Sequence, residues 1–148
     1  MTKNRIKKNW MLNAFQYQDG SKKVFRMRSI PPQNVSEKTL STCVIIDWPY
    51  SGELPTKETL NAIRVFEEAL SPLDTESGDS VLFHIITGCG NREWCYYTKN
   101  YDYFIHQLSS LLEDFPRFPI SIEYQENTNW NYWKAMLDFA NEEEVAVA

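Results

Sequence analysis

The side chains that most often perform acid–base and nucleophilic catalysis are scarce in this chain. Its 148 residues include two His and three Cys. No Ser or Cys stands in a recognisable Ser-His-Asp or Cys-His motif. Catalysis would therefore have to depend on carboxylates, and we expect neither a cofactor nor a resident metal ion.

Long apolar runs are also missing. No stretch approaches the roughly 20 apolar residues of a membrane-spanning helix. The apolar run after the basic segment Met1–Asn9 is too short for a signal peptide. The three cysteines, Cys43, Cys89 and Cys95, cannot all pair within the chain. We therefore expect a cytoplasmic protein with free thiols that does not bind membranes.

Aromatic and acidic residues, by contrast, are abundant. The chain holds eight Phe, eight Tyr and five Trp, and its net charge is −5. Residues 1–38 carry +7 and residues 39–148 carry −12. Either the basic segment folds against the acidic body and neutralises part of it, or the acidic surface receives a basic protein partner. Nucleic-acid binding is not expected, because the acidic body would repel phosphate.

Local patterns within residues 42–125 predict a βαββαβ core. Thr56 and Asn100 are suited to cap its two helices. The predicted strands cover residues 42–48, 81–86, 92–98 and 119–125, and the predicted helices cover residues 56–70 and 101–113. This order is the split βαβ pattern of ferredoxin-like folds, which have an antiparallel sheet with two helices on one face.

Two additions flank this core. Residues 1–38 contain two strand-like runs around Asp19-Gly20, which predicts a hairpin that extends the sheet or covers its other face. Residues 129–141 have a helical pattern, and residues 142–148 are expected to fray. We therefore predict a single α+β domain over residues 1–148.

The most informative segment is Thr87-Gly88-Cys89-Gly90-Asn91-Arg92-Glu93-Trp94. Its two glycines predict a tight hairpin turn with positive φ. Gly-rich turns bind phosphate when they open a helix, but this turn opens a strand. His84, Cys89 and Cys95 would supply zinc ligands only if they met, and the turn lies roughly 15 Å along the strands from the other two. We expect Cys95 to be a core residue and Cys89 an exposed thiol.

Antiparallel pairing of the strand 42–48 with the strand 92–98 would bring Asp47 and Trp48 close to Arg92, Glu93 and Trp94. One interpretation is an Asp47–Arg92 ion pair that fixes the register. The other is a polar site floored by the two Trp rings. The ion pair is favoured, because structural ion pairs are common.

The C-terminal helix has apolar residues around about half of its circumference. Either the helix is well buried, or Trp130 or Tyr132 remains exposed as an anchor for a partner. Tyr50 and Trp130 are the best anchor candidates.

Three segments together resemble a known family. They are Trp48-Pro49-Tyr50, the glycine turn with Arg92-Glu93-Trp94, and Pro119-Ile120-x-Ile122-Glu123 followed by Trp130 and Tyr132. They resemble the bacterial domain-of-unknown-function family 695. Some members of that family occur beside domains similar to the protein inhibitor of ribonuclease E, which is also ferredoxin-like. The resemblance implies the fold and supplies no catalytic residues.

Two function classes remain. The first is a non-catalytic protein-binding domain of inhibitor or regulator type, for example an immunity-type protein that neutralises a basic bacterial toxin. The alternative is a carboxylate-dependent enzyme that uses Asp47 and Glu93, alone or with a divalent metal ion. A homodimer is left open. The candidate binding residues are Asp47, Trp48, Tyr50, Gly88, Gly90, Arg92, Glu93, Trp94 and Trp130.

Overall fold

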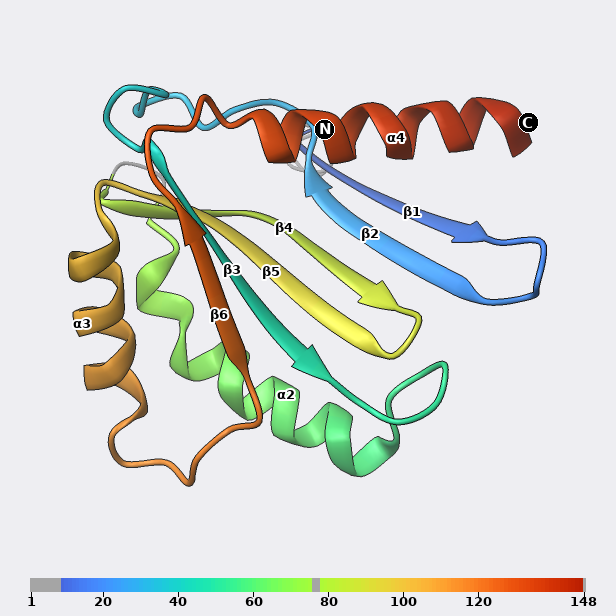
Figure 1. Cartoon of the computed structure of the whole chain (residues 1–148), viewed down its shortest axis with the longest axis horizontal. Helices are drawn as coiled ribbons and strands as arrows, with labels where there is room; N and C mark the ends of the chain where they lie inside the picture. Colours follow the sequence, from blue (N-terminus) through green and yellow to red (C-terminus); the bar gives the residue numbers. More distant parts are fainter. Residues whose placement is uncertain (1–8, 76–77, 148) are drawn as a thin grey trace, which may run out of the picture.

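The computed structural model describes residues 9–75 and 78–147. Within them, six strands form one antiparallel sheet in the order β1-β2-β4-β5-β3-β6 (Figure 1). The strands are β1 (Trp10–Gln16), β2 (Lys22–Arg28), β3 (Thr42–Pro49), β4 (Ser80–Gly88), β5 (Asn91–Thr98) and β6 (Ser121–Gln125). The helical elements are α2 (Lys57–Ala69), the short 3-10 helix η1 (Ser71–Leu73), α3 (Tyr101–Leu112) and α4 (Asn131–Val147).

The predicted ferredoxin-like α+β fold is confirmed. Its core is β3-α2-β4-β5-α3-β6, and the four core strands lie in the order β4-β5-β3-β6. Thr56 and Asn100 cap α2 and α3, because their side chains accept hydrogen bonds from the backbone of Thr59 and Tyr103. The N-terminal hairpin extends the sheet, since β2 pairs with β4. The basic residues Lys3, Arg5, Lys7 and Lys8 lie outside the described residues.

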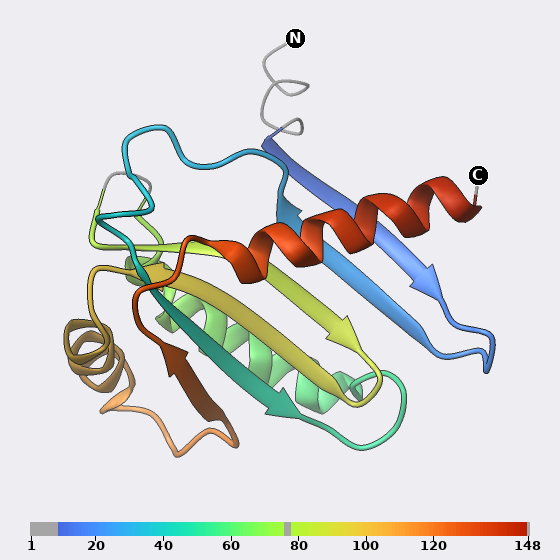
Figure 2. The same cartoon turned by 45° about the horizontal axis from the view of Figure 1, so that its top comes forward.

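The helices cover the two faces of the sheet unequally. Figures 1 and 2 show α2 and α3 on one face and α4 across the other. We call the face under α2 and α3 the α2 face and the face under α4 the α4 face. The core on the α2 face is built around Trp48, Phe66 and Trp94. Each side of the central strands β3, β4 and β5 is therefore packed against helix, which explains their continuous apolar runs.

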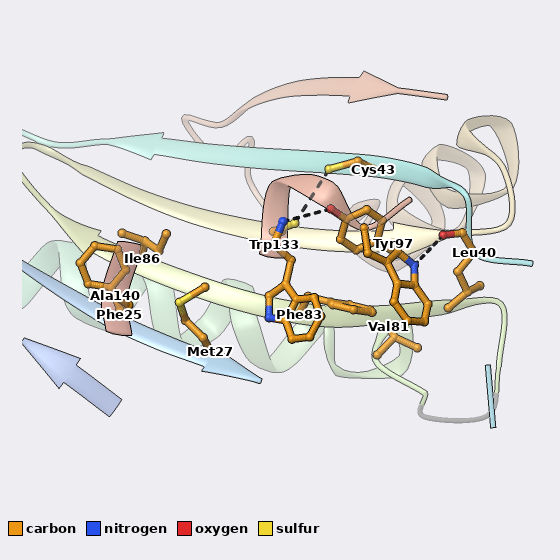
Figure 3. Close-up of a cluster of buried hydrophobic side chains, with 12 residues drawn as sticks. Phe25, Met27, Leu40, Cys43, Val81, Phe83, Ile86, Tyr97, Trp133 and Ala140 are labelled. Atoms are coloured by element: carbon orange, nitrogen blue, oxygen red, sulfur yellow. Dashed lines mark hydrogen bonds between the residues drawn. The ribbon is translucent and has the colours of Figure 1, made fainter. Parts of the chain in front are cut away.

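The core under α4 contains Trp130, which directly precedes this helix, and Trp133 in its first turn. Figure 3 shows Trp133 among the buried side chains of this core. The indole nitrogen of Trp133 donates to the carbonyl of Arg28 at 2.9 Å, and that of Trp130 donates to the carbonyl of Leu40 at 2.9 Å. The backbone amide of Trp133 also donates to the hydroxyl of Tyr97 at 3.2 Å. These bonds satisfy polar groups that would otherwise be costly to bury. The helix starts at Asn131 and its backbone is helical to Val147, beyond the predicted end of the helix at residue 141.

The turn between β4 and β5 has the predicted positive φ angles. Gly88 pairs with Asn91, and the two residues between them, Cys89 and Gly90, have φ of 55° and 83°. Positive φ at both central positions is the geometry of a type I′ hairpin. Gly88 itself has a φ of 148°, and a Cβ there would lie 2.1 Å from the carbonyl oxygen of Lys22. The turn therefore needs this glycine to pack against β2.

Candidate functional site

The β3–β5 register brings together the residues that the sequence placed near one another. Asp47 lies opposite Glu93, and Trp48 lies opposite Arg92. Because side chains alternate along a strand, however, these residues divide between the two faces. Asp47 and Glu93 lie on the α4 face, whereas Trp48, Arg92 and Trp94 lie on the α2 face.

Arg92 is bound on the α2 face by Glu67 of α2. Its Nη2 and Nε lie 2.6 and 3.2 Å from Oε2 of Glu67, and its Nη1 lies 2.7 Å from the hydroxyl of Thr87. The indole nitrogen of Trp94 donates to the same carboxylate oxygen at 2.8 Å. The predicted Asp47–Arg92 ion pair is therefore wrong. The polar site floored by two tryptophans is wrong too, since both rings are buried on the other side of the sheet from the carboxylates.

Glu93 is held on the α4 face by two hydrogen bonds to one oxygen. Nε2 of His84 lies 2.9 Å from Oε2, and the hydroxyl of Tyr132 donates to the same atom at 2.8 Å. No described residue donates to the other oxygen, Oε1. Burial on its own would raise the pKa of Glu93, but the bonds from His84 and Tyr132 outweigh burial, and the pKa is lowered.

An irregularity in β4 places His84 in this network. The register of β4 against β5 shifts between Leu82 and His84, so Phe83 and His84 both contribute to the α4 face. His84 is fully buried, and among the described residues its Nδ1 has no hydrogen-bond partner. Its attachment to the polar groups is thus through Nε2 alone.

Asp47 lies beside Glu93 and is bound by a single amide. Nδ2 of Asn91 donates to Oδ1 of Asp47 at 2.8 Å. Burial raises the pKa of Asp47, and the negative charges of Glu93 and Glu123 raise it further against the effect of the Asn91 bond. Two facing carboxylates therefore have pKa values shifted in opposite directions.

A pocket of about 330 Å³ lies over these groups on the α4 face. Three of its lining side chains are carboxylates and none is Lys or Arg. We call it the acidic pocket. It is lined by Cys43, Ile45 and Asp47 of β3, Glu93 of β5, Glu123, Tyr124 and Gln125 of β6, and Tyr132 of α4.

A second pocket of about 280 Å³ lies on the other side of the Glu93–Tyr132 hydrogen bond. It contains Gly88 of the glycine turn and carries opposite charges, on Lys23 and Glu93. Lys23 lowers the pKa of Glu93 through its positive charge, after the larger effects of His84 and Tyr132. The glycine turn and the acidic pocket are thus joined through Glu93.

The remaining predicted site residues lie elsewhere. Tyr50 is half-buried, and its backbone amide donates to the carbonyl of Gly90 at 2.9 Å, which ties the end of β3 to the glycine turn. Trp130 is 3 % exposed, so the prediction that it is an anchor for a partner is wrong. The predicted core position of Cys95 and exposed position of Cys89 are confirmed.

The predicted site lacked six of the eight residues that line the acidic pocket, among them Glu123 and Tyr132. Glu123 belongs to an alternating strand, and its position opposite Ile45 follows from the β3–β6 register. The apolar alternation of Ile120, Ile122 and Tyr124 was the signal that would have placed Glu123 on the other face. Tyr132 had no such signal, because its approach to Glu93 depends on how α4 crosses the sheet.

The described residues contain no group of three His, Cys, Asp or Glu side chains positioned to hold a metal ion. In the same part of the chain, no helix is long and apolar enough to cross a membrane.

The chain belongs to the family of unknown function DUF695, whose family model matches residues 8–137. The resemblance of the three motif segments is thereby confirmed. No curated protein matches the chain.

Proposed function

We propose that this protein is a non-catalytic protein-binding domain of inhibitor or regulator type that takes a basic side chain of its partner into the acidic pocket. The observation that carries this proposal is the lining of that pocket, with Asp47, Glu93 and Glu123 and no Lys or Arg. Carboxylates that share a pocket without a cation are costly to desolvate unless a binding partner supplies the positive charge.

The charge of the whole chain supports a basic partner. The net charge is −5, and a negative field accelerates the encounter with a basic protein. An immunity-type protein that neutralises a basic bacterial toxin is the concrete form that we propose.

The experiment compares proteins captured from host cells by the wild type and by Asp47→Asn/Glu123→Gln, with quantification by mass spectrometry. Both substitutions keep the shape of the side chain and remove its charge. We expect a basic protein to be captured by the wild type and lost by the variant. The matched control is Glu58→Gln/Glu68→Gln, which removes two exposed carboxylates from α2. Equal loss with both variants, or no loss with either, would contradict the proposal.

A second candidate is an enzyme in which Asp47 and Glu93 act as acid and base. The specific observation in its favour is the opposite direction of their pKa shifts, which is typical of acid–base pairs. Thermal melts with Mg²⁺, Mn²⁺ or Zn²⁺ separate the binding protein from a metal-assisted form of this enzyme, because such an enzyme is stabilised by its own metal. For the binding protein we expect no stabilisation specific to one metal.

A further inference from the structure

The strand β6 ends the sheet beside the acidic pocket. In the described part of the chain no strand pairs with its outer side, and Figure 2 shows it at the margin next to β3. Four of its five residues are exposed, and only Ile122 is half-buried. An edge strand of this kind presents unpaired backbone N–H and C=O groups to any extended chain.

The register shows what lies inward from this edge. On the α4 face, Glu93, Asp47 and Ser121 form one row across β5, β3 and β6. Cys95, Ile45 and Glu123 form the next row. Neighbouring strands are about 4.8 Å apart, so a residue added outside Ser121 would lie about 10 Å from Asp47. Because Ser121 is small, a long side chain in that row can extend across it to the acidic pocket.

Charge distinguishes this edge from the opposite side of the sheet. The residues of β6 and the pocket behind it carry carboxylates only, whereas β2 near the other margin carries Lys22, Lys23, Arg26 and Arg28. The other edge strand, β1, is also approached by α4, since Asn13 donates to the carbonyl of Ala140 at 2.9 Å. A basic segment is therefore attracted to β6 and repelled from the β1–β2 hairpin.

We propose that an extended basic segment of the partner pairs with β6 as an added strand and inserts an Arg or Lys side chain into the acidic pocket. The inference rests on the proposed function and adds the mode of recognition. Main-chain hydrogen bonds to β6 supply affinity that is independent of sequence, and the pocket selects the basic side chain. Arg suits the pocket well, because its planar guanidinium can bind more than one carboxylate.

The test uses the peptide acetyl-Thr-Val-Arg-Val-Thr-amide and three relatives, titrated into the full chain by NMR. One relative has citrulline, a neutral isostere, in place of Arg. The other two are N-methylated at alternate amides, so that one of them blocks pairing whichever amides face β6. We expect slowed hydrogen exchange at β6 amides with the parent peptide. Citrulline, and one of the two N-methylated patterns, should each weaken binding by about tenfold or more.

The outcomes separate the two proposals. If the citrulline peptide binds as well as the parent, selection of a basic side chain fails and the proposed function fails with it. If citrulline weakens binding but neither N-methylated peptide does, and β6 amides stay unprotected, strand addition is overturned while the proposed function stands. A parent peptide that does not bind at millimolar concentration also overturns strand addition. Glu123→Gln should weaken binding of the parent, and the matched variant Glu68→Gln should not.

Discussion

The two faces of the sheet treat their charged residues differently at the same place, where β3 and β5 pair. On the α2 face, the sheet supplies a cation, Arg92, and the helix supplies the anion, Glu67, within 2.6 Å. On the α4 face, the sheet supplies the carboxylates of Asp47 and Glu93. Their hydrogen bonds come from Asn91, His84 and Tyr132 and not from Lys or Arg.

The difference lies in how completely the hydrogen bonds within the fold satisfy each group of charges. In the Arg92–Glu67 group, each donor of Arg92 and Trp94 that points toward α2 is hydrogen-bonded to the carboxylate of Glu67. The α4 face leaves Oε1 of Glu93 without a donor among the described residues and leaves a pocket over Asp47. The carboxylate of Glu67 is therefore fully used by contacts within the fold, whereas the carboxylates on the α4 face line a pocket.

The largest effect on stability should come from disrupting the Glu67 hydrogen bonds on the α2 face. Glu67→Ala removes the carboxylate bound by Arg92 and Trp94. It leaves a largely buried guanidinium with only the Thr87 hydroxyl and leaves a buried indole N–H without an acceptor. We expect a loss of about 3 kcal/mol in the free energy of unfolding, measured in urea. Glu68→Ala, one position along and exposed, is the control and should cost less than about 0.5 kcal/mol. Equal losses in the two variants would show that the Glu67 network is not stabilising.

On the α4 face, Glu93→Gln should cause a smaller loss of stability. An amide accepts the hydrogen bonds of His84 and Tyr132 less strongly than a carboxylate does, so we expect a loss of about 1.5 kcal/mol at neutral pH. Because folding lowers the pKa of Glu93, its stabilisation is present above the ordinary Glu pKa and is lost as pH falls through the lowered value. The stabilities of wild type and variant should therefore converge in acid. Urea unfolding at several pH values measures this, and a difference that stays constant down to about pH 2 would contradict it.

Most of the fold was predictable because its signals are local. The caps at Thr56 and Asn100, the glycine turn, and the order of strands and helices specify the ferredoxin-like core and the neighbouring positions of Asp47 and Glu93. Antiparallel pairing also placed Trp48 near Arg92. The ion pair fails because side chains alternate along a strand. Asp47 and Trp48 point to opposite faces, so Asp47 and Arg92 are close in the register but separated by the sheet.

The composition of the site depended on tertiary contacts that no local pattern encodes. Glu67 was not among the predicted site residues, yet the packing of α2 brings it to Arg92. Tyr132 reaches Glu93 only because α4 crosses the sheet at that point. Trp130 looked like an exposed anchor, but its indole nitrogen is bound to the carbonyl of Leu40 in the core. In each case the partner comes from a distant part of the chain.

Tyr132→Phe isolates the contribution to stability of the hydrogen bond from α4 to Glu93 on the α4 face. The variant keeps the ring and removes the hydroxyl that donates to Glu93, so we expect a loss of about 1 kcal/mol. Tyr124→Phe removes a hydroxyl from a half-exposed ring stacked on Tyr101 and serves as the matched control, with an expected change close to zero. Thermal or urea unfolding compares them. If Tyr132→Phe were as silent as the control, the hydroxyl would not be holding Glu93 in the folded protein.

The smallest effect should have the opposite sign. Asp47→Asn keeps an oxygen that can accept from Asn91, and it removes a charge that faces Glu93 and Glu123. We expect a gain of about 0.5 kcal/mol at neutral pH, since like charges on facing strands destabilise a sheet. Folding raises the pKa of Asp47, so the wild-type penalty is present above that raised value and disappears as pH falls below the ordinary Asp pKa. The gain of the variant should vanish with it. A loss at neutral pH would mean that Asp47 is structural in the way that Glu67 is, and the contrast between the two faces would not hold at this position.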